Sequence, residues 1–270
     1  MRSPIFAVVP LALACQTPPD RVAQARDTTT DSIPTITTAP PPAESTPTGR
    51  ADTVNIFIDD VAVGNPLVVT GRARTFENTV NLRARSGDEL LSEEFVTSVG
   101  EMGQHNPFKA ELWITRVPRD SVTVEVFEYS AKDGSVQSLV SRAVPFDVPA
   151  ATAKLYFPTD DCTHISEFSR DVPKSAAMAR LLVEALIDGP TAAERQVGAS
   201  PAFPTGSAAR SVTLLQGVVT ADFNERLQNV GGSCAAQAIR ESVTRTLRQL
   251  PPVTRVVITA NGSEALALQP

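Results

Sequence analysis

The chain has 270 residues, of which 42% are hydrophobic and 20% charged, and its formal net charge is -6. Its basic residues are dispersed, which argues against nucleic acid as a partner, and no basic run is present that would hold an anionic membrane surface. The length suffices for two folded domains of ordinary size behind an N-terminal leader.

The first 14 residues indicate an export signal. One cation, Arg2, precedes an apolar run from Ile5 to Ala14. Spanning a bilayer as a helix takes roughly 20 residues, and this run is about half as long. We therefore expect residues 1–14 to be a signal peptide that is removed rather than a permanent membrane span.

Cys15 follows Ala12-Leu13-Ala14, a sequence that fits two processing enzymes. The small-x-small pattern suits ordinary signal cleavage, whereas an alanine directly before cysteine suits the lipoprotein route. Ala12 stands where lipoprotein signals usually carry leucine, so both routes stay open, as does a start codon set at the wrong place. The polar, proline-rich continuation favours lipidation of Cys15. We expect an exported protein, lipid-anchored to the cell membrane with its domains outside the cytoplasm.

The segment from Gln16 to Asp52 contains nine Thr and seven Pro and almost no large apolar side chains. Such a composition cannot bury enough apolar surface to offset the entropy of ordering. Residues 15–52 are therefore predicted to be a lipid anchor followed by a disordered or polyproline-like linker. Fully extended, the linker reaches on the order of 110 Å, so the folded part can stand well clear of the membrane.

Seven short runs of alternating apolar and polar residues lie between about residues 53 and 149. They are separated by turn residues and contain no helical stripe, which is typical of an antiparallel β-sandwich. The runs span residues 54–58, 67–73, 79–85, 94–99, 108–114, 122–129 and 144–148. The alternation places Leu82, Leu112, Val124 and Val126 in the core.

Two features of this segment invite a functional reading, but a structural one is preferred. Phe76 and Glu77 place an aromatic ring beside a carboxylate. Neighbours on a strand point to opposite faces, so we expect one to pack and the other to meet water or a cation such as Arg74. Trp113, the only tryptophan, is interpreted as a core residue rather than a platform for a sugar.

The same segment resembles the immunoglobulin-like domain of bacterial spore-germination proteins, the Gmad type. The resemblance rests on NPLVVTGRARTFENTVNLRAR, NPFKAELWI and VTVEVFEYSAKDGS. The positions that match the family pattern are Pro66, Gly71, Ala73, Phe76, Glu77, Phe108, Glu128, Ser130, Asp133 and Gly134. The resemblance covers residues 53–149 and implies an all-β immunoglobulin-like sandwich that serves as an interaction or spacer module.

Residues 152–270 mix strand and helix patterns. Strands are predicted at 153–157 and 167–172, a hairpin at 210–215 and 218–223, and a last strand at 253–260. Apolar residues at helical spacing predict helices at 174–187 and 234–250. Gly189-Pro190 ends the first helix, and Ser233 is expected to cap the second. This order predicts an α+β domain with helices on one face of a small sheet.

With Cys15 assigned to the lipid, Cys162 and Cys234 remain. An even pair in an exported protein is most simply a disulfide, which closes a loop of about 72 residues. Free buried thiols and a metal site are the alternatives, because Cys162 and His164 form a Cys-x-His step. A zinc site needs two further ligands, and the other histidine, His105, falls in the sandwich segment, so no metal is expected.

The second domain looks like a GerMN domain, the unit of GerM-like sporulation and spore-germination proteins. The matching motifs are Leu155-Tyr156-Phe157, the pattern of Leu186, Gly189, Pro190, Thr191 and Glu194, Pro204-x-Gly206, Ala221-Asp222-Phe223-Asn224, Thr246-Leu247 and Val253 to Val256. The resemblance implies a fold similar to the ring-building motif of envelope-spanning complexes, with weak self-association. It also implies a Cys162–Cys234 disulfide, because some members carry cysteines at these two places.

No pattern in this domain frames a catalytic site or a cofactor. Asp160, Asp161, Glu167 and Asp222 supply carboxylates, but paired carboxylates need a shared cleft, and we interpret these as loop and strand-end residues. Ser166 lacks the glycine framing of a nucleophile elbow. The Gly-Pro and Gly-Gly steps lack the lysine and the spacing of phosphate-binding loops. We expect no catalytic residues and no cofactor.

The sequence thus predicts a non-catalytic envelope lipoprotein that acts through protein-protein contacts, as an accessory or assembly factor of a membrane-associated complex. Its expected partners are an envelope or membrane protein complex and, through the lipid, the membrane. A module that binds cell-wall glycan or peptide is the main alternative, and a hydrolase is a third.

Overall fold

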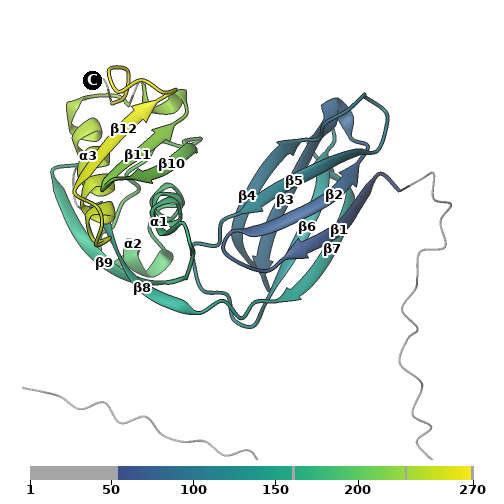
Figure 1. Cartoon of the computed structure of the whole chain (residues 1–270), viewed down its shortest axis with the longest axis horizontal. Coiled ribbons are helices and arrows are strands. Elements are labelled where there is room, and N and C mark those ends of the chain that lie inside the picture. The colour runs from purple at the N-terminus through teal and green to yellow at the C-terminus, as the bar shows by residue number, and fades with distance from the viewer. Residues whose placement is uncertain (1–53, 160–161, 229, 269–270) are drawn as a thin grey trace, which may run out of the picture. The chain divides into compact units, whose positions relative to one another are not determined.

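The computed structural model describes residues 54–159, 162–228 and 230–268 (Figure 1). The signal peptide, the lipid anchor at Cys15 and the linker all lie outside the described residues, as do Asp160 and Asp161. Among the helices that the structure describes, none is long and apolar enough to cross a membrane.

The first domain is an immunoglobulin-like sandwich of two antiparallel sheets, as expected. One sheet has the order β1-β2-β5 and the other β4-β3-β6-β7. The strands are β1 (Ile56–Ala62), β2 (Leu67–Ala73), β3 (Thr79–Ser86), β4 (Glu89–Thr97), β5 (Asn106–Leu112), β6 (Ser121–Tyr129) and β7 (Val136–Pro145). Leu82, Leu112, Val124 and Val126 are fully buried between the sheets. Alternation located this core because β3, β5 and β6 each turn one face into it and the other toward water.

The structure corrects the interpretation of Phe76 and Glu77. They lie in a tight turn, η2 (Phe76–Asn78), rather than on a strand. Glu77 has a φ of 52° and Asn78 one of 58°. These left-handed values break the extended conformation before β3. Both Phe76 and Glu77 are exposed. Neither residue packs in the core, because the strand alternation on which the expectation depended does not extend through this turn.

The second domain is an α+β unit with two separate sheets. β8 (Ala150–Thr159) and β9 (His164–Pro173) form a long hairpin, while β10 (Ala209–Leu215), β11 (Val218–Phe223) and β12 (Arg255–Ala260) form a sheet in which β12 runs parallel to β11. The helices are α1 (Met178–Ile187), α2 (Ala192–Gln196) and α3 (Ser233–Arg248). Because α1 contacts β8 and β10 while α3 contacts β8 and β12, the two long helices hold both sheets together.

Apolar packing and one disulfide stabilise the second domain. Phe157, Leu182, Phe223 and Leu247 are fully buried in a single core that draws on both sheets and both long helices. Burial of each such side chain is worth roughly 1.5–3 kcal/mol. This core is independent of the sandwich core, apart from Trp113, which packs against it from the first domain.

All three helices differ in part from expectation, and α1 begins at Met178 rather than at residue 174. Gly232 precedes α3, and Ser233 is the first helical residue rather than the cap. Helix α2 was not predicted at all, although Thr191 caps it: the Thr191 side chain accepts from the Glu194 amide, and the Glu194 carboxylate accepts from the Thr191 amide. This capping box is worth about 1 kcal/mol to a helix of only five residues.

Candidate functional site

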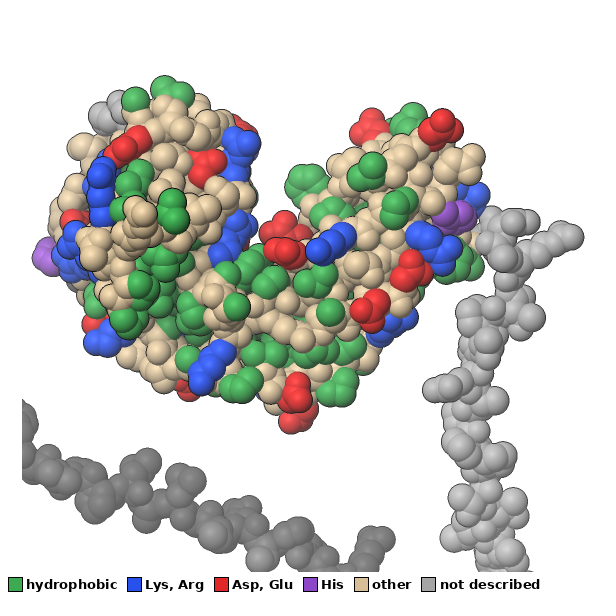
Figure 2. Space-filling model, viewed as in Figure 1, with side chains coloured by type: hydrophobic (Ala, Val, Ile, Leu, Met, Phe, Trp, Pro, Cys, Tyr) green, Lys and Arg blue, Asp and Glu red, His purple; other side chains and the backbone are tan. Residues whose placement is uncertain are grey.

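A cavity of about 490 Å³ lies where the sandwich and the second domain meet. Strand β4 and Trp113 line it from the sandwich, and α1 and residues 206–209 line it from the second domain. Figure 2 shows acidic and basic side chains on the walls of the hollow between the two domains. This is the largest of the described cavities and the only one of them that brings an aromatic ring, a cation and several carboxylates together.

An ion pair on α1 forms one wall of the cavity. Arg180 and Glu184 are one helical turn apart, and their Nε and Oε1 atoms are separated by 2.5 Å. Arg180 also donates to the Ala209 carbonyl at 2.8 Å, and its guanidinium lies 5.8 Å from the centre of the Trp113 ring. Cation–π attraction of this kind adds about 1 kcal/mol. Arg180 thus links α1 both to β10 and to the sandwich.

Three carboxyl groups share this environment. Burial raises the pKa of Glu184 to about 7; Arg180 opposes the rise, whereas the charges of Glu94 and Asp188 add to it. Partial enclosure also raises the pKa of Glu94, which stands on β4. Burial raises the pKa of Asp188, with a hydrogen bond from Thr115 acting against it. Glu184 therefore keeps its proton to a higher pH than an ordinary glutamate does.

Several hydrogen bonds join the two domains beside the cavity. Thr115 donates to Asp188 at 2.5 Å. The buried Asn65 amide donates to the carbonyls of Ile114 and Pro173, at 3.0 and 3.1 Å, and Ser175 donates to the Asn65 carbonyl at 2.5 Å. A single asparagine thus ties two segments of the sandwich to the connection between β9 and α1 in the second domain.

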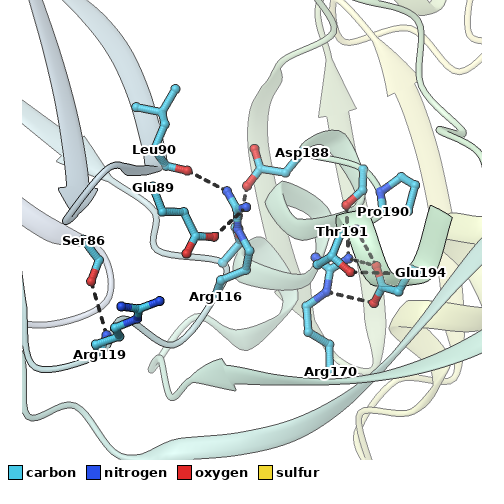
Figure 3. Close-up of polar contacts among 12 residues, drawn as sticks. Ser86, Glu89, Leu90, Arg116, Arg119, Arg170, Asp188, Pro190, Thr191 and Glu194 are labelled. Carbon is cyan, nitrogen blue, oxygen red and sulfur yellow. Dashed lines mark hydrogen bonds and ion pairs between the residues drawn. The ribbon is translucent and has the colours of Figure 1, made fainter. Parts of the chain in front are cut away.

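A second polar group lies close to the junction (Figure 3). Arg116 donates to the Glu89 carboxylate at 3.0 Å and to the Leu90 carbonyl at 2.8 Å, which fixes the connection after β5 to the start of β4. Asp188 points toward this group from the end of α1, and the positive charge of Arg116 lowers the pKa of Asp188 against the larger effect of burial.

The Gly-Pro-Thr-x-x-Glu motif has a structural explanation in the same view (Figure 3). Arg170 of β9 is 8% exposed and donates to both carboxylate oxygens of Glu194 and to the Gly189 carbonyl. Burial would raise the pKa of Glu194, but the hydrogen bonds from Arg170 and Thr191 lower it below its ordinary value. These hydrogen bonds hold the loop after α1 in place.

The structure joins Cys162 and Cys234 in a disulfide, with their Cα atoms 5.6 Å apart. The bridge ties the turn between β8 and β9 to the first turn of α3. His105 lies in the sandwich, where its Nε2 hydrogen-bonds with the Val54 carbonyl at 2.9 Å. Within the described ranges, no group of three or more residues of the metal-binding types gathers at one place.

Of the carboxylates singled out in the sequence, the two that the structure describes, Glu167 and Asp222, lie in separate contacts. Glu167 accepts from the Tyr156 hydroxyl at 2.6 Å on the exposed face of the hairpin. Asp222 accepts from Thr259 and from the Gly262 amide, both at 2.7 Å, and so closes the turn after β12. Ser166 shares a hydrogen bond with Thr159 rather than with a histidine.

The residues that do come together, Glu94, Trp113, Arg180 and Glu184, were not identified from the sequence as a site. Trp113 was expected in the sandwich core, but it is only partly buried and packs against the core of the other domain. The available signal was weak: Arg180 and Glu184 interrupt an otherwise apolar helix one turn apart.

Fold and site together define a class: a β-sandwich domain followed by a small α+β domain, joined at an acidic cavity. Two family models match the chain. Residues 58–135 match the immunoglobulin-like domain of bacterial spore germination (Gmad2), and residues 154–266 match the family described as sporulation and spore germination (Germane). The two folded segments of the chain therefore each match a family model of spore-germination type, and the resemblances inferred from the sequence are confirmed.

Solved structures with detectable similarity align with less than half of the chain. The tandem GerMN domains of the sporulation protein GerM from Bacillus subtilis are 23% identical with a TM-score of 0.37, over 42% of this chain and 40% of that one. The first GerMN domain of the same protein is 24% identical with a TM-score of 0.35, over 42% of this chain and 84% of that one. A putative lipoprotein from Clostridium perfringens is 16% identical with a TM-score of 0.30, over 43% of this chain and 76% of that one. The chain thus spans 40% of the tandem structure. No curated protein sequence matches it.

Proposed function

We propose that the chain is a non-catalytic lipoprotein of the cell envelope that acts through protein-protein contacts, as an accessory or assembly factor of a membrane-associated complex. One observation carries the proposal: a single chain joins two domain types that are both associated with sporulation and spore germination. The predicted lipid on Cys15 and the long linker behind it would tether both domains outside the cytoplasm.

The polar groups of the second domain support a non-catalytic role. Arg170 and Glu194 neutralise each other inside the fold, and Asp222 is engaged in closing a turn. Ser166, the serine nearest to a histidine in the sequence, has its described hydrogen bond to Thr159. A nucleophile needs a base within hydrogen-bonding distance and a third group to orient that base. The described contacts of these residues instead maintain the fold.

Crosslinking in intact cells, followed by membrane solubilisation and affinity capture of the full chain, tests the proposal. The expected result is a reproducible partner from the envelope, recovered in smaller amounts from a Cys15→Ser strain because the variant is no longer held at the membrane. An unrelated lipoprotein with the same tag is the control. Repeated capture of the chain with no partner beyond that control would contradict the proposal.

A second candidate function is binding of cell-wall glycan or peptide. The cavity at the domain junction favours it, because Trp113, Arg180 and the carboxyl groups of Glu94 and Glu184 offer a ring surface and hydrogen-bonding groups in one hollow. Co-sedimentation of the chain with purified peptidoglycan is the test. This function predicts that Glu94→Gln weakens co-sedimentation, whereas Glu241→Gln, on the exposed surface of α3, has no effect. Absence of the wild-type chain from the pellet would exclude it.

A further inference from the structure

Three large apolar side chains are exposed at one end of the sandwich. Phe76 is 64% exposed, Val99 79% and Met102 73%. Large apolar side chains that gather on a monomer surface usually mark a place of contact with another molecule or with a membrane. We call this set of three residues the apolar tip.

The strand register brings the apolar tip together from two connections. Residues 74–78 link β2 to β3, and residues 98–105 link β4 to β5. Thr79 pairs with Thr97, and Ala73 pairs with Asn106, so both connections leave the same end of the sandwich. Figure 1 shows them there together, beyond the ends of β2 to β5.

Hydrogen bonds hold the two connections side by side. The Ser98 amide donates to the Asn78 carbonyl at 2.8 Å, and the Asn78 side chain donates to the Gly100 carbonyl at 3.0 Å. Asn106 donates to the Asn78 side chain at 3.2 Å and to the Glu101 carbonyl at 2.7 Å. Asn78 and Asn106 are 8% and 5% exposed, so this network forms a buried polar base beneath the apolar tip.

The backbone at the tip is held in conformations that a free chain would avoid. Glu77 and Asn78 have φ values of 52° and 58°, and such left-handed residues cost of order 1 kcal/mol each. At Gly100 a Cβ would lie 2.0 Å from the Asn106 side chain, so only glycine fits. Because surrounding bonds maintain this geometry, Phe76 and the 98–105 connection are presented in a fixed, outward position rather than folded back onto the sandwich.

The chain enters the sandwich at the same end. The Val54 carbonyl hydrogen-bonds with His105, in the second of the two connections. Residues 15–52, which precede the sandwich, are the predicted lipid anchor and linker. The opposite end of the sandwich carries Asn65 and Thr115, which contact the second domain. The apolar tip therefore lies at the end of the sandwich where Val54, the first described residue, is bound, and opposite the end that contacts the second domain.

We propose that the apolar tip inserts into the interface of a lipid bilayer, as a second membrane contact beside the lipid on Cys15. The inference rests on the proposed anchor, since a tether to the same membrane raises the local concentration of lipid at the tip to a level at which a weak contact persists. The exposed charged residues within two positions of these three side chains in the sequence, Glu77 and Glu101, are acidic. The tip therefore fits a zwitterionic lipid surface, into which it inserts by apolar burial rather than by attraction to anionic headgroups.

Vesicles of phosphatidylcholine and phosphatidylethanolamine test this insertion with the full chain carrying Cys15→Ser. In this chain Cys162 and Cys234 form the disulfide, so an added cysteine is the single labelling site. An environment-sensitive fluorophore is placed at Met102→Cys, and for comparison at Leu215→Cys. Leu215 is 72% exposed in the second domain, against 73% for Met102, so the two labels start in equal contact with water.

We expect the emission of the Met102→Cys label to shift to the blue with vesicles and to be quenched by quenchers carried on the lipid tails, while the Leu215→Cys label is unchanged. Adding Phe76→Ser and Val99→Ser should weaken vesicle binding by about tenfold for each apolar side chain removed, because its burial in the bilayer is lost. Both side chains are exposed in the free protein, so the fold does not depend on them. Equal emission of the two labels at saturating lipid would overturn the proposal. Binding that needs anionic lipid and is lost in high salt would overturn it as well.

The outcome is separate from that of the proposed function. The vesicle assay uses a chain that cannot be lipidated at position 15, so it reports on the apolar tip whether or not cells attach lipid to Cys15. Conversely, failure to capture an envelope partner would contradict the accessory role and leave the vesicle result unchanged.

Discussion

Replacing Glu184 by glutamine should stabilise the protein, and more so at high pH. The wild-type carboxyl is buried beside Glu94 and Asp188, which raises its pKa to about 7 from an ordinary value of 4.5. Between these two pH values the folded chain keeps a proton that the unfolded chain has lost, so stability falls as the pH rises through this window. The difference of about 2.5 pKa units corresponds to a ceiling of about 3 kcal/mol, reached above pH 7.

Glutamine has the shape of the protonated carboxyl and carries no charge. Glu184→Gln should therefore raise the free energy of unfolding by about 1–3 kcal/mol at pH 8 and by little near pH 5. Urea unfolding of the full chain, followed by the fluorescence of Trp113, is the assay, because this only tryptophan lies against Arg180 at the junction. The raised pKa values of Glu94 and Asp188 act in the same direction, so wild-type stability itself should decline from pH 5 to pH 8.

Glu241→Gln is the matched control. Glu241 also pairs with an arginine one helical turn away, Arg245, but on the exposed surface of α3. An exposed pair of this kind contributes about 0.5 kcal/mol, so its loss should be slight and similar at both pH values. The reasoning would be refuted if Glu184→Gln destabilised the protein at pH 8, or if its effect were the same at pH 5 and pH 8.

Three further changes test other parts of the structure. Reducing the Cys162–Cys234 bridge should lower stability by about 4 kcal/mol, and alkylation with mass spectrometry should label both thiols only after reduction; labelling of the untreated protein would contradict the bridge. Arg170→Ala should cost about 3–5 kcal/mol in chemical unfolding, because it leaves the Glu194 carboxylate buried without its partner, and a loss below 1 kcal/mol would show that the pair is dispensable. Glu77→Gly should raise the melting temperature through a gain of about 0.5–1 kcal/mol, since glycine adopts a positive φ without strain; a lower melting temperature would argue against strain at this turn.

Alternation located most strands of the sandwich, but it placed the last one at residues 144–148, whereas β7 spans Val136–Pro145 and has no fully buried residue. Leu82 and Val124 could be assigned to the core from alternation alone, and the hairpin of β10 and β11 from two runs separated by Gln216-Gly217. The capping box of Thr191 and Glu194 carries a sequence signature that was present and was overlooked.

The remaining features depend on contacts between distant segments. The turn at Phe76 and Glu77 is set by Asn106, a partner that no local pattern indicates. The acidic cavity is lined by Glu94 of one domain and Glu184 of the other. No sequence pattern around either residue indicates that the two lie close together. The residue type of Trp113 predicts a core position, but it cannot tell which of the two domain cores the side chain packs against.

The central claim is that a lipid on Cys15 holds these two domains at the cell membrane. The most direct measurement is the share of the full chain in the membrane fraction of cells that express either wild type or Cys15→Ser. The account predicts that the wild-type chain sediments with membranes and that Cys15→Ser is released, because an unlipidated chain retains only the weak contact of the apolar tip. Unchanged retention of Cys15→Ser in the membrane fraction would contradict the claim.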